Sequence, residues 1–235
     1  AYALASLGKR VLAVDFDSQG NLSTCMGIED LRTEEKTIGH LMMAETDDEP
    51  VEAVDDFIQN NAGIDFISAN VYLSAVDTKL RLEMGAEKML SNILEPLRDK
   101  YDYILIDTAP TLGSLTINAL AAADSVIIPV NPQLLAMMGL QDFIKTVSKI
   151  KHRINPRLEI AGILLTMCDS RTNLCKVLME ETFKGQIKVF DTCIPTTVKV
   201  GEAVYYNMAV EQYSPKSAAS IAYRNFAKEL IGYEG

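Results

Sequence analysis

The chain has 235 residues, which is enough for one large α/β domain with a core buried on both faces of a sheet. Its 48% hydrophobic and 23% charged content is ordinary for a globular protein, and no run of about 18 apolar residues predicts a transmembrane helix. The net charge of −10 argues against a general affinity for nucleic acid, and four irregularly spaced cysteines indicate a reducing cytoplasm without a zinc site or disulfide framework.

Apolar strand-like runs and helical periodicity alternate along the chain. Strands are predicted over 11–15, 64–68, 103–107, 125–130, 158–167 and 188–192. Helices are predicted over 2–7, 38–43, 51–58, 80–97, 115–122, 135–150, 174–183 and 217–231. This alternation is typical of a doubly wound, mostly parallel sheet with helices on both faces, and no linker divides residues 1–235. The chain opens within a predicted helix, whereas a domain of this kind normally opens with a strand.

Two of the predicted strands end in aspartate. Asp15 ends the first strand and Asp17 follows two residues later, while Asp107 ends the strand that begins at Tyr103. In an open parallel sheet, ligands bind beyond the carboxyl ends of the strands, so these carboxylates are expected to share one crevice. A hydrated Mg²⁺ is usually held by one or two carboxylates, waters and substrate phosphates. The sequence therefore predicts a nucleotide-phosphate site, although Asp15 and Asp17 could instead cap a helix or solvate a loop.

A mildly basic segment lies within the acidic chain. Residues 1–140 carry 9 Lys and Arg against 22 Asp and Glu, whereas residues 141–200 carry 10 against 6. The second segment could form a phosphate-contacting face, or it could be a solvated surface with no partner.

The order of motifs resembles the ParA/Soj/MinD group of ATPases with a deviant Walker A motif, and best resembles the ParA/Soj branch. The matching strings are Gly8-Lys9-Arg10-Val11-Leu12, Asp15-x-Asp17-x-Gln19-Gly20-Asn21, Tyr101 to Asp107 with Pro110, Leu115-Thr116-x-Asn118-Ala119-Leu120, Ile128-Pro129-Val130, Asn155-Pro156, Gly162 to Met167, Asp169-x-Arg171-Thr172 and Ile194-Pro195. They extend over nearly the whole chain. The resemblance implies a P-loop NTPase type of fold, with residues 1–235 as a single ParA-type nucleotide-binding domain, incomplete at its N-terminus.

The resemblance also implies a set of nucleotide-site residues. Asp17 matches the catalytic aspartate that positions the hydrolytic water, and Asp15 matches its partner near the metal. Asp107 matches the Walker B aspartate that holds the Mg²⁺ shell, with Asp107 and Asp15 contacting the metal mostly through water. Met167 and Pro195 match positions that line the adenine pocket. ATP and Mg²⁺ are the implied cofactors.

Further implications concern partners. Arg171 and Lys199 match the region of the family that binds DNA non-specifically. The implied function is an ATP-dependent DNA-partitioning switch that dimerises on ATP and hydrolyses it when a ParB-like partner binds. Such a protein would be cytoplasmic and associated with the nucleoid in its ATP-bound state. Thr196 stands where an arginine is frequent in the family, which weakens the DNA-binding expectation.

The glycine-rich Walker A loop of the family, with its two lysines, does not occur in residues 1–235. It would lie just before Ala1, so the sequence predicts an N-terminal truncation, and the 235 residues alone are expected to be inactive. Three alternatives stay open. They are a MinD-like or other positioning ATPase acting on membrane or protein partners, a metabolic enzyme of the same fold such as a cobyrinate-type amidase, and a non-enzymatic remnant.

Overall fold

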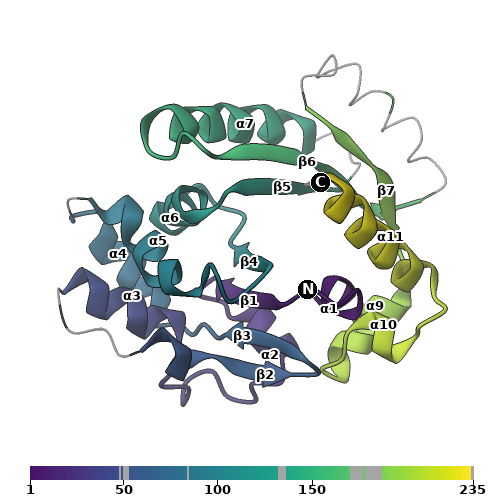
Figure 1. Ribbon diagram of the computed structural model, residues 1–235, viewed down its shortest axis with the longest axis horizontal. Coiled ribbons are helices and arrows are strands. Elements are labelled where there is room, and N and C mark those ends of the chain that lie inside the picture. Colours follow the sequence, from purple (N-terminus) through teal and green to yellow (C-terminus); the bar gives the residue numbers. More distant parts are fainter. Residues whose placement is uncertain are drawn as a thin grey trace. The chain divides into compact units, whose positions relative to one another are not determined.

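A computed structural model describes residues 1–47, 49, 53–83, 85–131, 136–169, 177 and 187–233 (Figure 1). The chain divides into two compact units, Ala1–Ala123 and Asp124–Gly235. Each unit contains a sheet with parallel strands and its own helices, so the predicted α/β class is confirmed. The assignment of residues 1–235 to a single nucleotide-binding domain remains a prediction.

The first unit is built around a four-stranded sheet with the order β2-β3-β1-β4. Its strands are β1 (Val11–Phe16), β2 (Gln59–Asn61), β3 (Ile64–Ile67) and β4 (Tyr103–Thr108). β1 pairs in parallel with β3 and β4, while β2 joins β3 antiparallel through a tight hairpin. Every residue of β1 is buried, which explains its continuous apolar run before Asp15.

Short helices complete the first unit. They are α1 (Tyr2–Ser6), α2 (Asn21–Cys25), α3 (Ile38–Thr46), α4 (Leu73–Leu80), α5 (Met89–Leu94) and α6 (Ser114–Ala122), with 3₁₀ turns η1 (Val54–Phe57), η2 (Ala86–Lys88) and η3 (Glu95–Leu97). Helices α3 to α6 pack into one hydrophobic core with β1, to which Leu12, Phe16, Leu41, Leu73 and Leu90 contribute fully buried or nearly fully buried side chains. Burial of this apolar surface is the main force that holds the first unit together.

The prediction of a single helix over 80–97 is wrong. Helix α4 ends at Leu80, and α5 begins at Met89 after a break that contains Gly85 with φ +74°. Leu82, which the helical periodicity of 80–97 would put on one side with Met89 and Leu90, is 88% exposed. The charged residues on both sides of Leu82 favour solvent, and Gly85 adopts a left-handed conformation that ends helical geometry at low cost.

The second unit contains a three-stranded parallel sheet with the order β5-β6-β7. Its elements are β5 (Ser125–Val130), α7 (Ala136–Arg153), β6 (Glu159–Cys168), β7 (Val189–Pro195), α9 (Val198–Tyr205), α10 (Val210–Tyr213) and α11 (Ala218–Tyr233). Helix α11 packs along β7, where the rings of Phe190 and Phe226 meet edge to face with centroids 5.0 Å apart. The predicted helix over 174–183 lies outside the described residues.

The side chain of Glu229 in α11 binds the backbone of the edge strand β7. Its two carboxylate oxygens accept hydrogen bonds from the backbone N–H groups of Asp191 and Thr192, at 2.7 and 3.0 Å. The helix therefore supplies acceptors to β7, which is the last strand in the sheet order. No helix in the part of the chain that the structure describes is both long and apolar enough to cross a bilayer.

We predict that Gly162→Ala destabilises the protein. An added Cβ at Gly162 in β6 would lie 2.9 Å from the carbonyl oxygen of Lys188 and 2.9 Å from the Phe190 ring. The strands would have to separate, at a cost of about 1–3 kcal/mol in the free energy of unfolding. Thermal unfolding followed by circular dichroism measures the effect.

The matched control is Gly139→Ala in α7, where an added Cβ meets no heavy atom within 4 Å. Because alanine is the better helix former, this control should stabilise the protein by about 0.5–1 kcal/mol. Equal melting temperatures for the two variants would contradict the proposed close approach of β6 and β7.

Candidate nucleotide site

Asp15 is the buried centre of the candidate site. It lies one residue before the end of β1 and has no exposed surface, and its Oδ2 atom accepts hydrogen bonds from the backbone N–H and from the hydroxyl of Ser23, both at 2.7 Å. Its Oδ1 atom accepts a longer hydrogen bond of 3.3 Å from the N–H of Asp17. Burial raises the pKa of Asp15 above its usual range, and the hydrogen bonds from Ser23 and Asp17 oppose that rise.

Asp17 lies in the tight turn that leaves β1. The N–H of Gly20 donates to the Asp17 carbonyl at 2.9 Å, and the N–H of Gln19 donates to the Asp17 Oδ1 atom at 3.0 Å. Gly20 has φ +63°, and a Cβ there would lie 2.5 Å from the side chain of Leu31. Within the described part of the chain, the Oδ2 atom of Asp17 accepts no hydrogen bond, so it is available to a water or ligand.

Asp107 lies beside Asp15 because β1 and β4 pair in parallel with Asp15 opposite Asp107. Asp107 is exposed, but the surrounding protein displaces part of the water around its carboxylate and raises its pKa, and the charges of Asp15 and then Asp17 raise it further. Burial and the charges of Asp15 and Asp107 also raise the pKa of the Cys25 thiol in α2. The structure therefore brings together the three aspartates predicted for the nucleotide site. We call them the carboxylate cluster.

The carboxylate cluster suits a hydrated cation. No group of three or more His, Cys, Asp or Glu side chains in the described residues is arranged to enclose a metal ion directly. Mg²⁺ keeps several waters and is commonly held by one or two carboxylates together with phosphates, so a partly open cluster of this kind fits it. The fit to ATP is incomplete, because residues 1–235 contain no G-x-x-x-x-G-K-[ST] string to cradle the phosphates.

Met167 and Pro195 occupy neighbouring strand ends in the second unit. Cys168 pairs with Pro195 across β6 and β7, and the N–H of Thr196 donates to the Cys168 carbonyl at 3.0 Å. Met167 is 64% exposed with φ +54°, and its sulfur accepts a hydrogen bond of 3.5 Å from Asn131. Pro195 also borders a surface hollow of about 780 Å³, and Met167 is not among the residues that line it.

The two residues predicted to bind DNA differ in what the structure shows. Arg171 lies outside the described residues. The Nζ atom of Lys199 donates to Glu202 at 2.7 Å and lies 5.8 Å from the centroid of the Tyr213 ring. Three other lysines of the basic segment are also ion-paired, namely Lys145, Lys151 and Lys188. The charge available to phosphates is therefore smaller than the residue count suggests.

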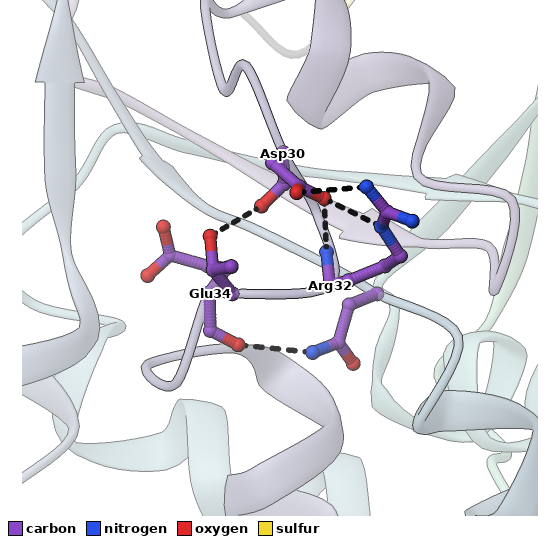
Figure 2. A network of polar contacts seen from close by, with 5 residues as sticks. Asp30, Arg32 and Glu34 are labelled. Atoms are coloured by element: carbon purple, nitrogen blue, oxygen red, sulfur yellow. Dashed lines mark hydrogen bonds and ion pairs between the residues drawn. The ribbon is translucent and has the colours of Figure 1, made fainter.

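A polar network anchors the loop that follows α2 (Figure 2). The Arg32 guanidinium donates to both oxygens of Asp30, at 2.9 and 3.0 Å, and the Asn70 amide donates to the Glu34 carbonyl at 3.0 Å. The hydrogen bonds from Arg32 lower the pKa of Asp30. This loop therefore reaches the segment after β3, which also contacts Ser23, a buried residue that the sequence motifs did not single out.

The chain is similar to known proteins over most of its length. A family model described as "AAA domain" matches residues 1–160. The sporulation initiation inhibitor protein Soj of Bacillus subtilis is 38% identical over 230 residues, which cover 97% of this chain and 88% of Soj. The chromosome partitioning protein ParA of Caulobacter vibrioides is 38% identical over 238 residues, which cover 99% of this chain and 86% of ParA. The chain belongs to the ParA/Soj family.

A solved structure extends the comparison of this ParA/Soj-family chain. It is described as cobyrinic acid a,c-diamide synthase from Mycobacterium smegmatis with a bound ATP analogue and magnesium. It is 30% identical, has a TM-score of 0.82, and the match covers 99% of this chain and 86% of that one. These comparisons support an ATPase at the level of the family and confirm the predicted P-loop NTPase type of fold.

We predict that the carboxylate cluster destabilises the metal-free protein at neutral pH. The pKa values of Asp15 and Asp107 are raised above the ordinary 3.8, so the folded state binds protons more tightly than the unfolded state. Stability should therefore fall as the pH rises from about 4 through these raised values. Asp107→Asn should raise the melting temperature at pH 7 by a few degrees and much less at pH 4.

The matched control is Asp102→Asn, which should lower the melting temperature at pH 7 instead of raising it. The hydrogen bonds from Arg10 lower the pKa of Asp102 to about 2. Its ion pair should therefore stabilise the protein above pH 3.8, and the benefit should disappear as the pH falls towards 2. Melting curves in chelator at several pH values test both variants. A parent-like melting temperature for Asp107→Asn at pH 7 would show that charge repulsion within the carboxylate cluster does not destabilise the protein.

Proposed function

We propose that this protein is an ATP-dependent partitioning switch for a chromosome or plasmid. The observation that carries the proposal is the carboxylate cluster. The parallel pairing of β1 and β4 sets Asp15 opposite Asp107 near the carboxyl ends of the two strands. Support comes from the relatives, since ParA of Caulobacter vibrioides is a chromosome partitioning protein and the chain spans 86% of its length.

In this proposal the cluster divides the work between its members. Asp17 orients the attacking water, because its free oxygen lies at the turn beyond β1. Asp15 and Asp107 hold the hydration shell of Mg²⁺, and Met167 and Pro195 flank the adenine of ATP. When bound, Mg²⁺ would supply positive charge that offsets the negative charge of the phosphates. Because residues 1–235 lack a Walker A string, we expect them to bind ATP weakly by themselves, and assays should use the protein encoded by the complete gene.

We predict that Asp17→Ala abolishes ATP hydrolysis and leaves ATP binding largely intact. The loss should be about 100-fold or more in kcat, the size typical of a positioned group that acts on the reacting water. Asp30→Ala is the control, because Asp30 is a carboxylate of the following loop that is paired with Arg32. Release of phosphate measures turnover and calorimetry measures binding. Turnover at the parent rate in Asp17→Ala would refute its assigned role.

Partners follow from the same proposal. ATP would join two protomers, the dimer would bind DNA without sequence specificity, and a ParB-like partner would stimulate hydrolysis. The protein would then be cytoplasmic and associated with the nucleoid in its ATP-bound state. DNA binding should require the dimer, because one segment with 10 basic and 6 acidic residues on a chain of charge −10 makes few phosphate contacts.

We predict that Lys199→Ala weakens DNA binding equally across sequences and lowers the salt slope by about 1, as expected when one phosphate contact is lost. Arg171→Ala should act in the same way. Glu202→Gln should strengthen binding, because it releases Lys199 from its ion pair. Asp55→Asn, which releases Lys100 in the first unit, makes the same charge change elsewhere and is the control. Titration of duplex DNA at two salt concentrations, with ATP, gives the slopes. If Glu202→Gln and Asp55→Asn changed the affinity for DNA equally, Lys199 would not lie on the DNA-binding surface.

An alternative function is a positioning ATPase that acts on a protein partner. The observation that favours it is the exposed apolar surface at and after α9, where Val198 and Tyr205 are 74% and 81% exposed. Tyr206 and Met208 continue this surface.

A further inference from the structure

Ser23 is a buried polar residue in contact with Asp15 of the carboxylate cluster. It is the third residue of the short helix α2 and has no exposed surface. Its N–H and its hydroxyl both donate to the Oδ2 atom of Asp15 at 2.7 Å. Hydrogen bonds to a charged acceptor are about twice as strong as neutral ones, so this pair fixes the carboxylate in one orientation.

The same hydroxyl accepts a hydrogen bond from the opposite direction. The backbone N–H of Ala69, which follows β3, donates to the Ser23 Oγ atom at 2.8 Å. Gly20 also packs closely against Ala69, since a Cβ added at Gly20 would lie 3.2 Å from the Ala69 carbonyl oxygen. The Ala69 backbone therefore meets both the turn that carries Asp17 and the helix that carries Ser23.

The segment around Ala69 is firmly anchored. The Ser68 carbonyl accepts from the N–H of Ile38 at 2.8 Å, and Thr37 and Ser68 form a parallel β-bridge. Asn70 donates to the Glu34 carbonyl at 3.0 Å. These contacts make residues 68–70 a rigid reference against which the turn after β1 is held.

We propose that Ser23 is a positioning residue whose hydroxyl ties the Asp15 carboxylate to the Ala69 backbone and so holds the Asp17 turn in a single arrangement. The proposal rests on the proposed ATPase function. A serine hydroxyl has one donor and can accept at its oxygen, and here Asp15 and Ala69 use both capacities. Without the hydroxyl, the Ala69 N–H loses its acceptor and Asp15 loses one of its donors, in a buried site where neither is readily replaced by water.

The test compares variants of the hydroxyl in the complete protein. Ser23→Ala removes it and Ser23→Thr keeps it. Thr24→Ala is the matched control, because the Thr24 hydroxyl is the next along the helix and donates to the Gly20 carbonyl at 3.1 Å instead of to a carboxylate. Amide hydrogen exchange of Ala69 is measured by NMR without nucleotide, and kcat and KM for ATP are measured separately.

We expect Ser23→Ala to accelerate exchange of the Ala69 amide by about tenfold or more, the size of one lost hydrogen bond to a buried group. It should lower kcat by about tenfold, with KM for ATP within about twofold of the parent. Ser23→Thr should restore both values, and Thr24→Ala should leave both near those of the parent. Ser23→Cys keeps the shape with a weaker hydrogen bond and should show smaller losses of both kinds.

Several results would overturn the proposal. A parent-like kcat in Ser23→Ala would show that the hydroxyl does not position the reacting groups. Failure of Ser23→Thr to restore kcat would do the same. If Ser23→Ala does not fold, parent-like values for Ser23→Cys would be decisive against it. If the parent itself hydrolyses no ATP, the proposed function fails. The amide exchange rate of Ala69 then tests the link from Ser23 to Asp15 and Ala69 separately. An exchange rate in Ser23→Ala equal to that of the parent overturns that link.

Discussion

The parallel register between β1 and β4 is the constraint on which the candidate site depends. It places Asp15 directly opposite Asp107, so two carboxylates of the same charge stand on neighbouring strand ends. A shift of the register by one residue would turn every side chain of β4 to the other face of the sheet. The fully buried β1 fixes this register by its packing against the helices of the first unit. The hydrophobic core therefore sustains an electrostatic repulsion that a bound cation would relieve.

Parts of the fold that depend on long apolar runs could be predicted from the sequence. β5 was predicted with its observed bounds, and β1 and β4 extend only one residue beyond the prediction. β2 was missed, because Gln59, Asn60 and Asn61 carry no apolar signal. Its hairpin turns at Ala62 and Gly63, both with positive φ, and alanine is not among the residues that mark such a turn.

The candidate site was predictable in its charges but not in its hydrogen bonds. Asp15, Asp17 and Asp107 stood out because each follows an apolar run. Ser23 could not be singled out, because α2 has only five residues and such a short helix depends on tertiary contacts instead of its own propensity. The contact between Ser23 and Ala69 joins residues 46 positions apart, which no local pattern records.

The strand β4 lies at the edge of its sheet and carries Asp107 of the carboxylate cluster. Among the described residues, β4 pairs only with β1, and its residues Ile104, Leu105 and Ile106 are half-buried although their sequence is typical of a central strand. An open apolar edge favours the addition of another strand. A strand added there in parallel would end beside Asp107, and loops at the carboxyl ends of parallel strands are where such sheets bind phosphate.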